Sequence, residues 1–192
     1  MINEVPLFPL NTVLFPGGLL PLRIFEQRYM DMAKDCLREE SFFGICLIRE
    51  GAEVGAPATP VDVGCLARIA SWDMPQLGLL HITARGEQRF RIKSRTVQRD
   101  GLARGSIELL AQDSDGEIAQ DCAVCVRLLE RIIEEQARLF EPPHRLESAS
   151  WVGSRLAEML PLPLGVKQEL LEMSDAVARL ERLTALLRPG KR

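Results

Sequence analysis

Residues 6–29 read PLFPLNTVLFPGGLLPLRIFEQRY. Four prolines, Pro6, Pro9, Pro16 and Pro21, lie inside or beside apolar runs in this stretch. Because proline has no amide to donate to a β ladder, each run is restricted to an edge strand, a strand end or a bulge. Short apolar strands interrupted in this way predict a closed or strongly bent β structure.

The composition is that of a soluble globular protein with one or two domains. The chain has 192 residues, of which 46% are apolar and 27% are charged, so it can bury a sizeable core. Residues 1–116 carry 13 basic and 15 acidic side chains, and residues 117–192 carry 11 and 12. Neither half is basic in bulk, which argues against a nucleic-acid-binding module.

The N-terminus does not resemble a secretory signal. Glu4 and the internal prolines replace the basic start and uninterrupted apolar stretch of a signal peptide, and no apolar run approaches the roughly 18 residues needed to cross a bilayer. We therefore predict a cytoplasmic protein with no membrane association. An odd number of cysteines lies within apolar runs, which predicts reduced core thiols and no disulfide framework; these are Cys36, Cys46, Cys65, Cys122 and Cys125.

The hydrophobic period divides the chain into a β part and a helical part. A short helix is predicted over 26–38 and a buried strand over 42–48, followed by a Gly-, Ala- and Pro-rich loop over 51–60. Four more strands are predicted, over 63–71, 77–84, 88–98 and 103–110, with breaks at 73–76 and 99–101.

Beyond residue 116 the period changes from 2 to 3.6. One helical stripe contains Ile118, Cys122, Cys125, Leu129, Ile132, Ile133 and Phe140. This helix is predicted to end before Pro142, and three more are predicted over 150–160, 164–173 and 175–187. Their starts are marked by Ser148 or Ser150, by Pro163 in the first turn, and by Ser174 or Asp175. We predict a β domain over 1–114 and a helical bundle over 115–192.

No catalytic, metal or cofactor site is predicted. Cys122 and Cys125 form a C-x-x-C pair, but a tetrahedral zinc site needs two further ligands and no second pair exists. Their place on the apolar stripe favours core thiols over redox or metal chemistry. His81 lies in an apolar strand and His144 in a linker, and no Gly-x-Ser-x-Gly nucleophile motif is present. The protein is therefore predicted not to be an enzyme.

The break that begins at Trp72 is the main candidate binding surface. A hairpin tip is normally polar, whereas this one offers an indole at Trp72, a thioether at Met74 and the apolar Leu77. The competing interpretation, which we weigh evenly, is that Trp72 folds back over the mouth of the barrel. Leu19 and Leu20 form a second candidate apolar edge.

A strand with alternating cations is the alternative site. Arg89, Arg91, Lys93 and Arg95 alternate with apolar or small residues, so an extended strand would place them on one face, where they could meet phosphates. Glu87 shares this face, and a half-buried strand exposes a polar face to water in any case. We therefore weigh nucleic-acid binding below polypeptide binding.

Three segments resemble the N-terminal, substrate-binding domain of the Lon proteases. They are the opening from Pro6 to Tyr29, the run GEQRFRI at 86–92, and the run KQELLE at 167–172. The resemblance implies an α+β fold, with a bent, PUA-like β barrel followed by a helical bundle. No Gly-x-x-x-x-Gly-Lys-Ser/Thr phosphate loop occurs in residues 1–192, so we expect a stand-alone, bacterial-type member without the ATPase and peptidase modules.

The resemblance also implies the partner. We expect the chain to bind unfolded or extended polypeptide, which a separate ATPase or protease would then receive. The alternative is a homodimer, in which the apolar edges of two copies cover each other and no polypeptide binds to those edges.

Overall fold

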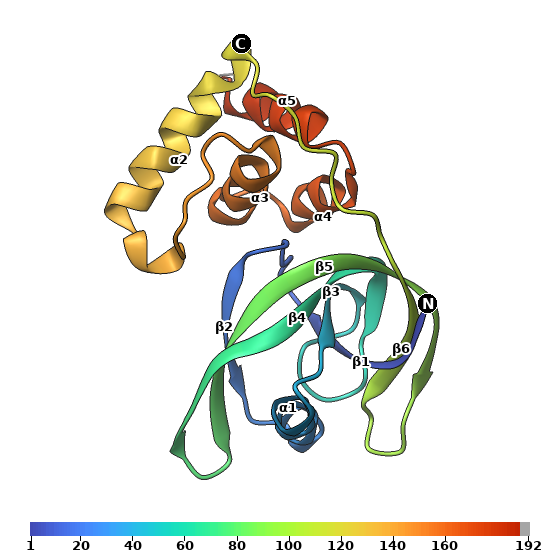
Figure 1. Cartoon of the computed structure of the whole chain (residues 1–192). Coiled ribbons are helices and arrows are strands. Elements are labelled where there is room, and N and C mark those ends of the chain that lie inside the picture. Colours follow the sequence, from blue (N-terminus) through green and yellow to red (C-terminus); the bar gives the residue numbers. More distant parts are fainter. Residues whose placement is uncertain (189–192) are drawn as a thin grey trace. The chain divides into compact units, whose positions relative to one another are not determined.

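The computed structural model describes residues 1–188 and places all of their strands before Leu110 (Figure 1). The chain divides into two compact units, Met1–Leu110 and Ala111–Arg192. The first contains a six-stranded sheet with one helix, and within residues 1–188 the second contains four α-helices. The α+β class predicted from the sequence is confirmed.

The sheet of the first unit closes on itself. Its elements in chain order are β1 (Ile2–Leu10), β2 (Leu19–Ile24), α1 (Gln27–Glu39), β3 (Phe43–Glu50), β4 (Thr59–Gln76), β5 (Leu79–Val97) and β6 (Ala103–Leu109). The strand order is β2-β5-β4-β3-β1-β6, and an additional β5–β6 pairing joins the last strand to β5. Strands β1 and β3 are parallel and the other pairs are antiparallel. The sheet is therefore strongly bent, but it is not a regular barrel.

Strand β5 exchanges one neighbour for another along its length, and Gly86 lies where it does so. Residues 80–85 of β5 pair with β2, whereas residues 90–97 pair with β6. The Gly86 amide donates to the Gly18 carbonyl at 2.9 Å, and the Gly17 amide donates to the Gly86 carbonyl at 2.7 Å. A Cβ on Gly86 would lie 2.2 Å from the Phe15 carbonyl oxygen. The turn after Phe15 can approach β5 this closely only because residue 86 has no side chain.

Strands β4 and β5 form one long hairpin, which corrects two predictions. The strands expected over 77–84 and 88–98 are a single strand, and the break expected over 73–76 lies inside β4. The turn consists only of Leu77 and Gly78, and Gly78 adopts φ +84°, a left-handed conformation that glycine reaches at little steric cost. Pro75 is tolerated because β4 pairs with β3 only as far as Ala67, so the end of β4 is an edge.

Two apolar clusters fill the first unit. In one, the rings of Phe8 and Tyr29 stack at 4.1 Å, and α1 contributes its buried face, including Cys36 as predicted. In the other, Phe90 is fully buried. The Phe90 ring lies against Gly44 and Gly64, where a Cβ would approach it to 2.6 and 2.9 Å.

The helical unit contains α2 (Ala123–Glu135), α3 (Ala149–Met159), α4 (Leu164–Glu172) and α5 (Ala176–Leu187), with short 3-10 turns over Gln120–Cys122 and Ala137–Leu139. Helix α2 is shorter than the helix predicted from the apolar stripe, because the chain leaves helical geometry at Gln136. Ser148 caps α3 and Asp175 caps α5. Each is one of the two residues predicted for that cap. Within residues 1–188, no helix is long and apolar enough to span a membrane.

A buried arginine joins three parts of the helical unit. Arg179 is 1% exposed, and its Nε donates to the Leu170 carbonyl at 2.8 Å. Its Nη1 pairs with Asp113 Oδ2 at 2.5 Å, and its Nη2 donates to the Met173 carbonyl. Through this side chain, α5 is bonded to the end of α4 and to the segment that precedes α2.

The same preceding segment also bonds to the start of α3. Asp115 accepts from Ser148 Oγ at 2.6 Å and from the Ser150 amide at 3.0 Å. Burial raises the pKa of Asp115, and the hydrogen bonds that its carboxylate accepts lower it. The hydrogen bonds have the larger combined effect, so the pKa of Asp115 lies below its ordinary value. The segment containing Asp113 and Asp115 is thus part of the helical unit, in which Ser114 also bonds to Ser174.

We expect Gly86→Ala to destabilise the first unit by about 3 kcal/mol or more, because the added methyl must displace main chain at Phe15. Gly165→Ala is the matched control, since a Cβ there meets no atom within 4 Å. Urea denaturation followed by circular dichroism measures both. Equal stability of Gly86→Ala and the wild type would contradict the close approach.

We expect Arg179→Met to lower the free energy of unfolding of the helical unit by about 3–5 kcal/mol, because it removes the cation paired with the buried Asp113 carboxylate and one donor from each of two carbonyls. Arg182→Met in the same helix removes an exposed charge and should change little. Trp151 in α3 reports on this unit when Trp72 is replaced by Phe, so that urea denaturation followed by its fluorescence isolates the effect. A loss for Arg182→Met as large as that for Arg179→Met would refute the role of the buried pair.

Candidate functional site

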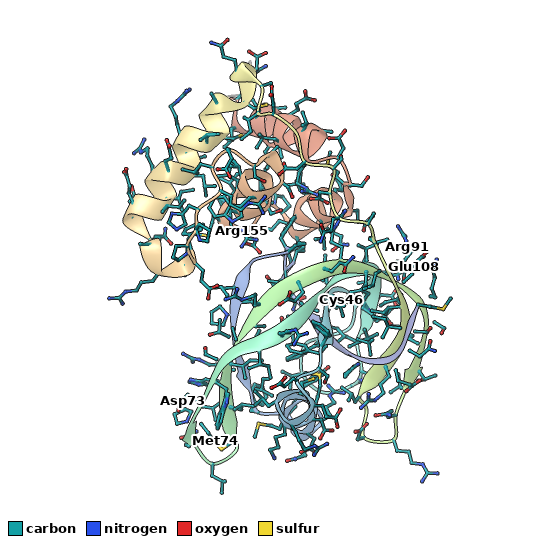
Figure 2. The ribbon with its side chains drawn as sticks, in the orientation of Figure 1. Cys46, Asp73, Met74, Arg91, Glu108 and Arg155 are labelled. Carbon is teal, nitrogen blue, oxygen red and sulfur yellow. The ribbon has the colours of Figure 1, made fainter. Side chains whose placement is uncertain are left out.

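The end of the β4–β5 hairpin projects beyond its neighbours. Beyond Ala67, β4 pairs with β5 and no longer with β3, and β2 reaches only as far as Leu80 of β5. Figure 2 shows Asp73 and Met74 at this end of the hairpin. We call residues 72–77 the hairpin tip.

The hairpin tip exposes large apolar side chains. Trp72 is 59% exposed, Met74 is 38% exposed and Leu77 is 97% exposed. The indole of Trp72 is therefore open to solvent, and it does not fold back over the mouth of the barrel. Exposed apolar side chains gathered at one tip are typical of an interaction surface.

Leu19 and Leu20 do not belong to this surface. Both are half-buried, and they pair with Arg85 and Ala84 at the end of β2 that lies away from the hairpin turn. Leu20 packs against the main core of the unit. The structure thus brings three of the five predicted apolar residues together and separates the other two from them.

A concavity of about 470 Å³ lies beside the tip on the sheet formed by β2, β5 and β4. Its lining includes Trp72 together with a row of three polar residues, Arg23, His81 and Asp73, which occupy matching register positions on the three strands. Sequence analysis missed this row because its members are up to 58 residues apart in a chain whose pairing register was unknown. The only local signal was the alternation of side chains along this strand, which places Arg23 on the solvent face and its neighbours Leu22 and Ile24 on the core face.

A second, smaller concavity of about 50 Å³ lies at the other side of Arg23. Phe25 and Val54 line it and are 58% and 55% exposed. Neither was a predicted site residue. Arg23 lines both concavities.

The four cations of β5 do not form one exposed face, which corrects that prediction. Arg89 is in register with Cys65 and is only 3% exposed. Lys93 Nζ pairs with Glu108 Oε2 at 2.5 Å, and a hydrogen bond from Lys93 lowers the pKa of Glu108. Arg91 is in register with the same Glu108 (Figure 2), and Arg95 donates to Thr59 Oγ1 at 3.3 Å. Arg89 is thus removed from the predicted face, and Lys93 and Arg95 are already bonded to side chains of the same unit.

The cysteines are all free and buried. In the helical unit Cys125 Sγ lies 3.2 Å from Thr184 Oγ1, and burial raises the pKa of the Cys125 thiol. Burial likewise raises the pKa of Cys36 and Cys46. These thiols are therefore protonated and packed at neutral pH. No group of three or more potential metal ligands occurs in the part of the chain that the structure describes.

Comparison with known proteins gives consistent matches along the chain. Residues 4–188 match the family model of the ATP-dependent protease La (LON) substrate-binding domain. A crystal structure of a Lon N-terminal domain protein from Xanthomonas campestris is 38% identical, with a TM-score of 0.80 over 96% of this chain and 98% of that one. The N-terminal domain of a Mycobacterium avium complex Lon protease shares the fold at 19% identity, with a TM-score of 0.69 over 95% and 96% of the two chains.

Several curated relatives are Lon proteases. The Lon protease of Anaeromyxobacter dehalogenans is 27% identical over 95% of this chain, and Lon protease 2 of Myxococcus xanthus is 25% identical over the same share. The chain spans 23% of the length of each of these relatives. The resemblance of the opening segment to the Lon family is thereby confirmed, and the chain belongs to the family of the Lon substrate-binding domain.

Proposed function

We propose that this chain is a non-catalytic polypeptide-recognition module that binds exposed apolar segments of unfolded or extended polypeptides at the hairpin tip. The observation that carries the proposal is the exposure of Trp72 near the end of β4 and of Leu77 in the two-residue turn that follows it. A separate ATPase or protease receives the bound polypeptide, since the matched family model is that of the substrate-binding domain.

The chemistry of the tip suits partners with little fixed sequence. Trp72 supplies a large, rigid contact area, and the flexible thioether of Met74 adapts to different apolar shapes. The Leu77 side chain is almost wholly exposed, so a partner can cover it without first displacing a neighbour. These three residues need no specific hydrogen-bonding partner on the ligand.

Side chains, rather than strand addition, supply the contacts. Pro21 interrupts β2 and Pro75 interrupts the end of β4, and a proline at a strand edge discourages pairing with a further strand. The two edges beside the concavity are thus protected against ladder formation, while the side chains between them stay accessible.

The residues of the concavity support a binding role. Ser71, Asp73 and His81 all line it, and they are residue types found in hydrolase triads. However, His81 Nε2 has no hydrogen-bond partner among the described residues, whereas the base of such a triad bonds to its nucleophile.

We expect the double substitution Trp72→Ser with Met74→Ser to weaken binding of a reduced, unfolded model polypeptide about tenfold or more, because central aromatic contacts dominate such interfaces. The same protein in its folded, oxidised form serves as the ligand control. Val97→Ser is the matched variant, since it removes an apolar side chain of similar exposure, 55%, from the other end of β5. Fluorescence anisotropy of the labelled polypeptide measures the affinities.

Unchanged affinity in the double variant would refute the tip as the binding site, and equal binding of folded and unfolded ligand would refute the proposed function. Light scattering during size-exclusion chromatography tests the alternative of self-association. A wild-type dimer that the double variant converts to a monomer, with no change in polypeptide binding, would assign the tip to a homodimer.

A further inference from the structure

A third concavity, of about 290 Å³, lies between the first residues of β1, Arg104 of β6 and the last turns of α1. None of the residues of the hairpin tip lines it. Pockets for drug-sized molecules have volumes of roughly 300–1,000 Å³, so this one suits a smaller ligand.

Helix α1 supplies one wall of this concavity. Four of its residues line it, and their spacing of i, i+3, i+4 and i+7 places them on one stripe of the helix. They are Met32, Asp35, Cys36 and Glu39. Met32 and Cys36 are buried in the apolar cluster that contains Phe8, whereas the side chains of Asp35 and Glu39 are partly exposed. The wall is therefore apolar at its base and acidic at its rim.

The strand register places Arg104 on the wall opposite α1. Arg104 is in register with Pro6 of β1, and side chains two residues apart along a strand share a face. Phe8 lies two residues from Pro6, Leu102 lies two residues from Arg104, and both belong to the apolar cluster against which α1 packs. Pro6 and Arg104 therefore lie on the face of the sheet that α1 covers, and both line the concavity.

Arg104 retains hydrogen-bond donors for a ligand. Its Nη1 donates to the Glu4 carbonyl at 2.8 Å, and within residues 1–188 its guanidinium forms no ion pair. Its Nε is closed to solvent, so the two terminal nitrogens are the atoms that can meet a ligand. These nitrogens carry four of the five guanidinium donors, and the bond to Glu4 uses one of them.

The carboxylates of α1 are also only partly engaged. Asp35 Oδ1 and Glu39 Oε1 each bond to Arg38, at 2.8 and 3.0 Å, which leaves the second oxygen of each carboxylate. Burial is the main cause that raises the pKa of the Cys36 thiol, and that pKa also responds to Arg104 and to both carboxylates. Both signs of charge thus lie near one thiol without pairing across the concavity.

We propose that this concavity binds a free α-amino acid with an apolar side chain. The carboxylate of the amino acid pairs with Arg104, and its ammonium group pairs with Asp35 and Glu39. Its side chain contacts Met32 and the half-buried Phe42, which supply apolar surface to the lining.

Both charges of the amino acid are needed for this preference. Glu4 also lines the concavity, which therefore contains three carboxylates and one guanidinium. A carboxylic acid without the ammonium group meets like charges there, and an amine without the carboxylate leaves Arg104 unpaired. The proposal does not depend on the proposed function, because the two use different residues.

The test compares leucine with 4-methylpentanoate and isoamylamine, which keep its apolar group but lack the ammonium and the carboxylate, respectively. The wild type should bind leucine about tenfold or more tightly than either analogue, since each analogue loses a hydrogen-bonded charge. Amide chemical-shift titration of the isotope-labelled protein measures the affinities and locates the site. The amides of residues 3–5 and 35–42 should shift, while those of the hairpin tip stay unchanged.

Two substitutions test the named residues. Arg104→Gln and Asp35→Asn should each weaken leucine binding about tenfold. Asp31→Asn is the matched control, because it removes a carboxylate of similar exposure, 55% against 47%, from the same helix and outside the concavity. Its affinity for leucine should equal that of the wild type.

Equal affinity of the wild type for leucine and either analogue would overturn the proposal, and so would unchanged leucine binding in a folded Arg104→Gln variant. The comparison of ligands uses the wild type alone, so it decides the question if Arg104→Gln does not fold. No leucine-induced shift at millimolar leucine would also overturn the proposal, but the proposed function would stand, because it rests on Trp72.

Discussion

The close contact between Gly86 and the turn after Phe15 is the constraint on which the first unit depends. Two main-chain hydrogen bonds and a missing side chain hold this turn against β5. Because the turn leads directly into β2, it fixes where β2 begins to pair with β5. Beyond Gly86 that side of β5 becomes free for β6, whose pairing closes the sheet. One glycine thus separates the part of β5 that builds the closed sheet from the part that builds the candidate site.

The position of the candidate site follows from that division. Since β2 pairs with only the first part of β5, the three strands β2, β5 and β4 form a wing with edges that carry Pro21 and Pro75. Arg23, His81 and Asp73 lie in one register row across its three strands. The same arrangement leaves the hairpin tip without a covering strand, which explains the exposure of its apolar side chains. The helical unit has its own centre in the Arg179–Asp113 pair.

The features that the sequence predicted correctly are local. Helix caps at Ser148 and Asp175 depend on residues two or three positions apart. The opening itself was predicted wrongly, because β1 runs without interruption through Pro6 and Pro9 and pairs with both β3 and β6. The exposed tip residues were identified because Trp72 and Met74 are unusual residues for a turn. These signals can be read from neighbouring residues, without knowledge of strand pairing.

The features that were missed depend on register. The opposition of Arg23 to His81 follows from the pairing of β2 with β5, which no short motif encodes. The prediction of a cationic face was wrong at Arg89 because the register shifts between Cys65 and Ala67 of β4, which places Arg89 opposite the buried Cys65. Continuity of β4 through Pro75 was missed for a related reason, since only the strand order shows that this end of β4 is an edge.

The central claim, that the wing and its tip bind polypeptide, is tested most directly by amide chemical-shift mapping. Titration of the isotope-labelled protein with a reduced, unfolded polypeptide should shift the amides of residues 71–83 and 21–25, while the amides of Arg91, Lys93 and Arg95 stay unchanged. Shifts confined to those cations, or to the helical unit, with none at Trp72 or Met74, would contradict the account.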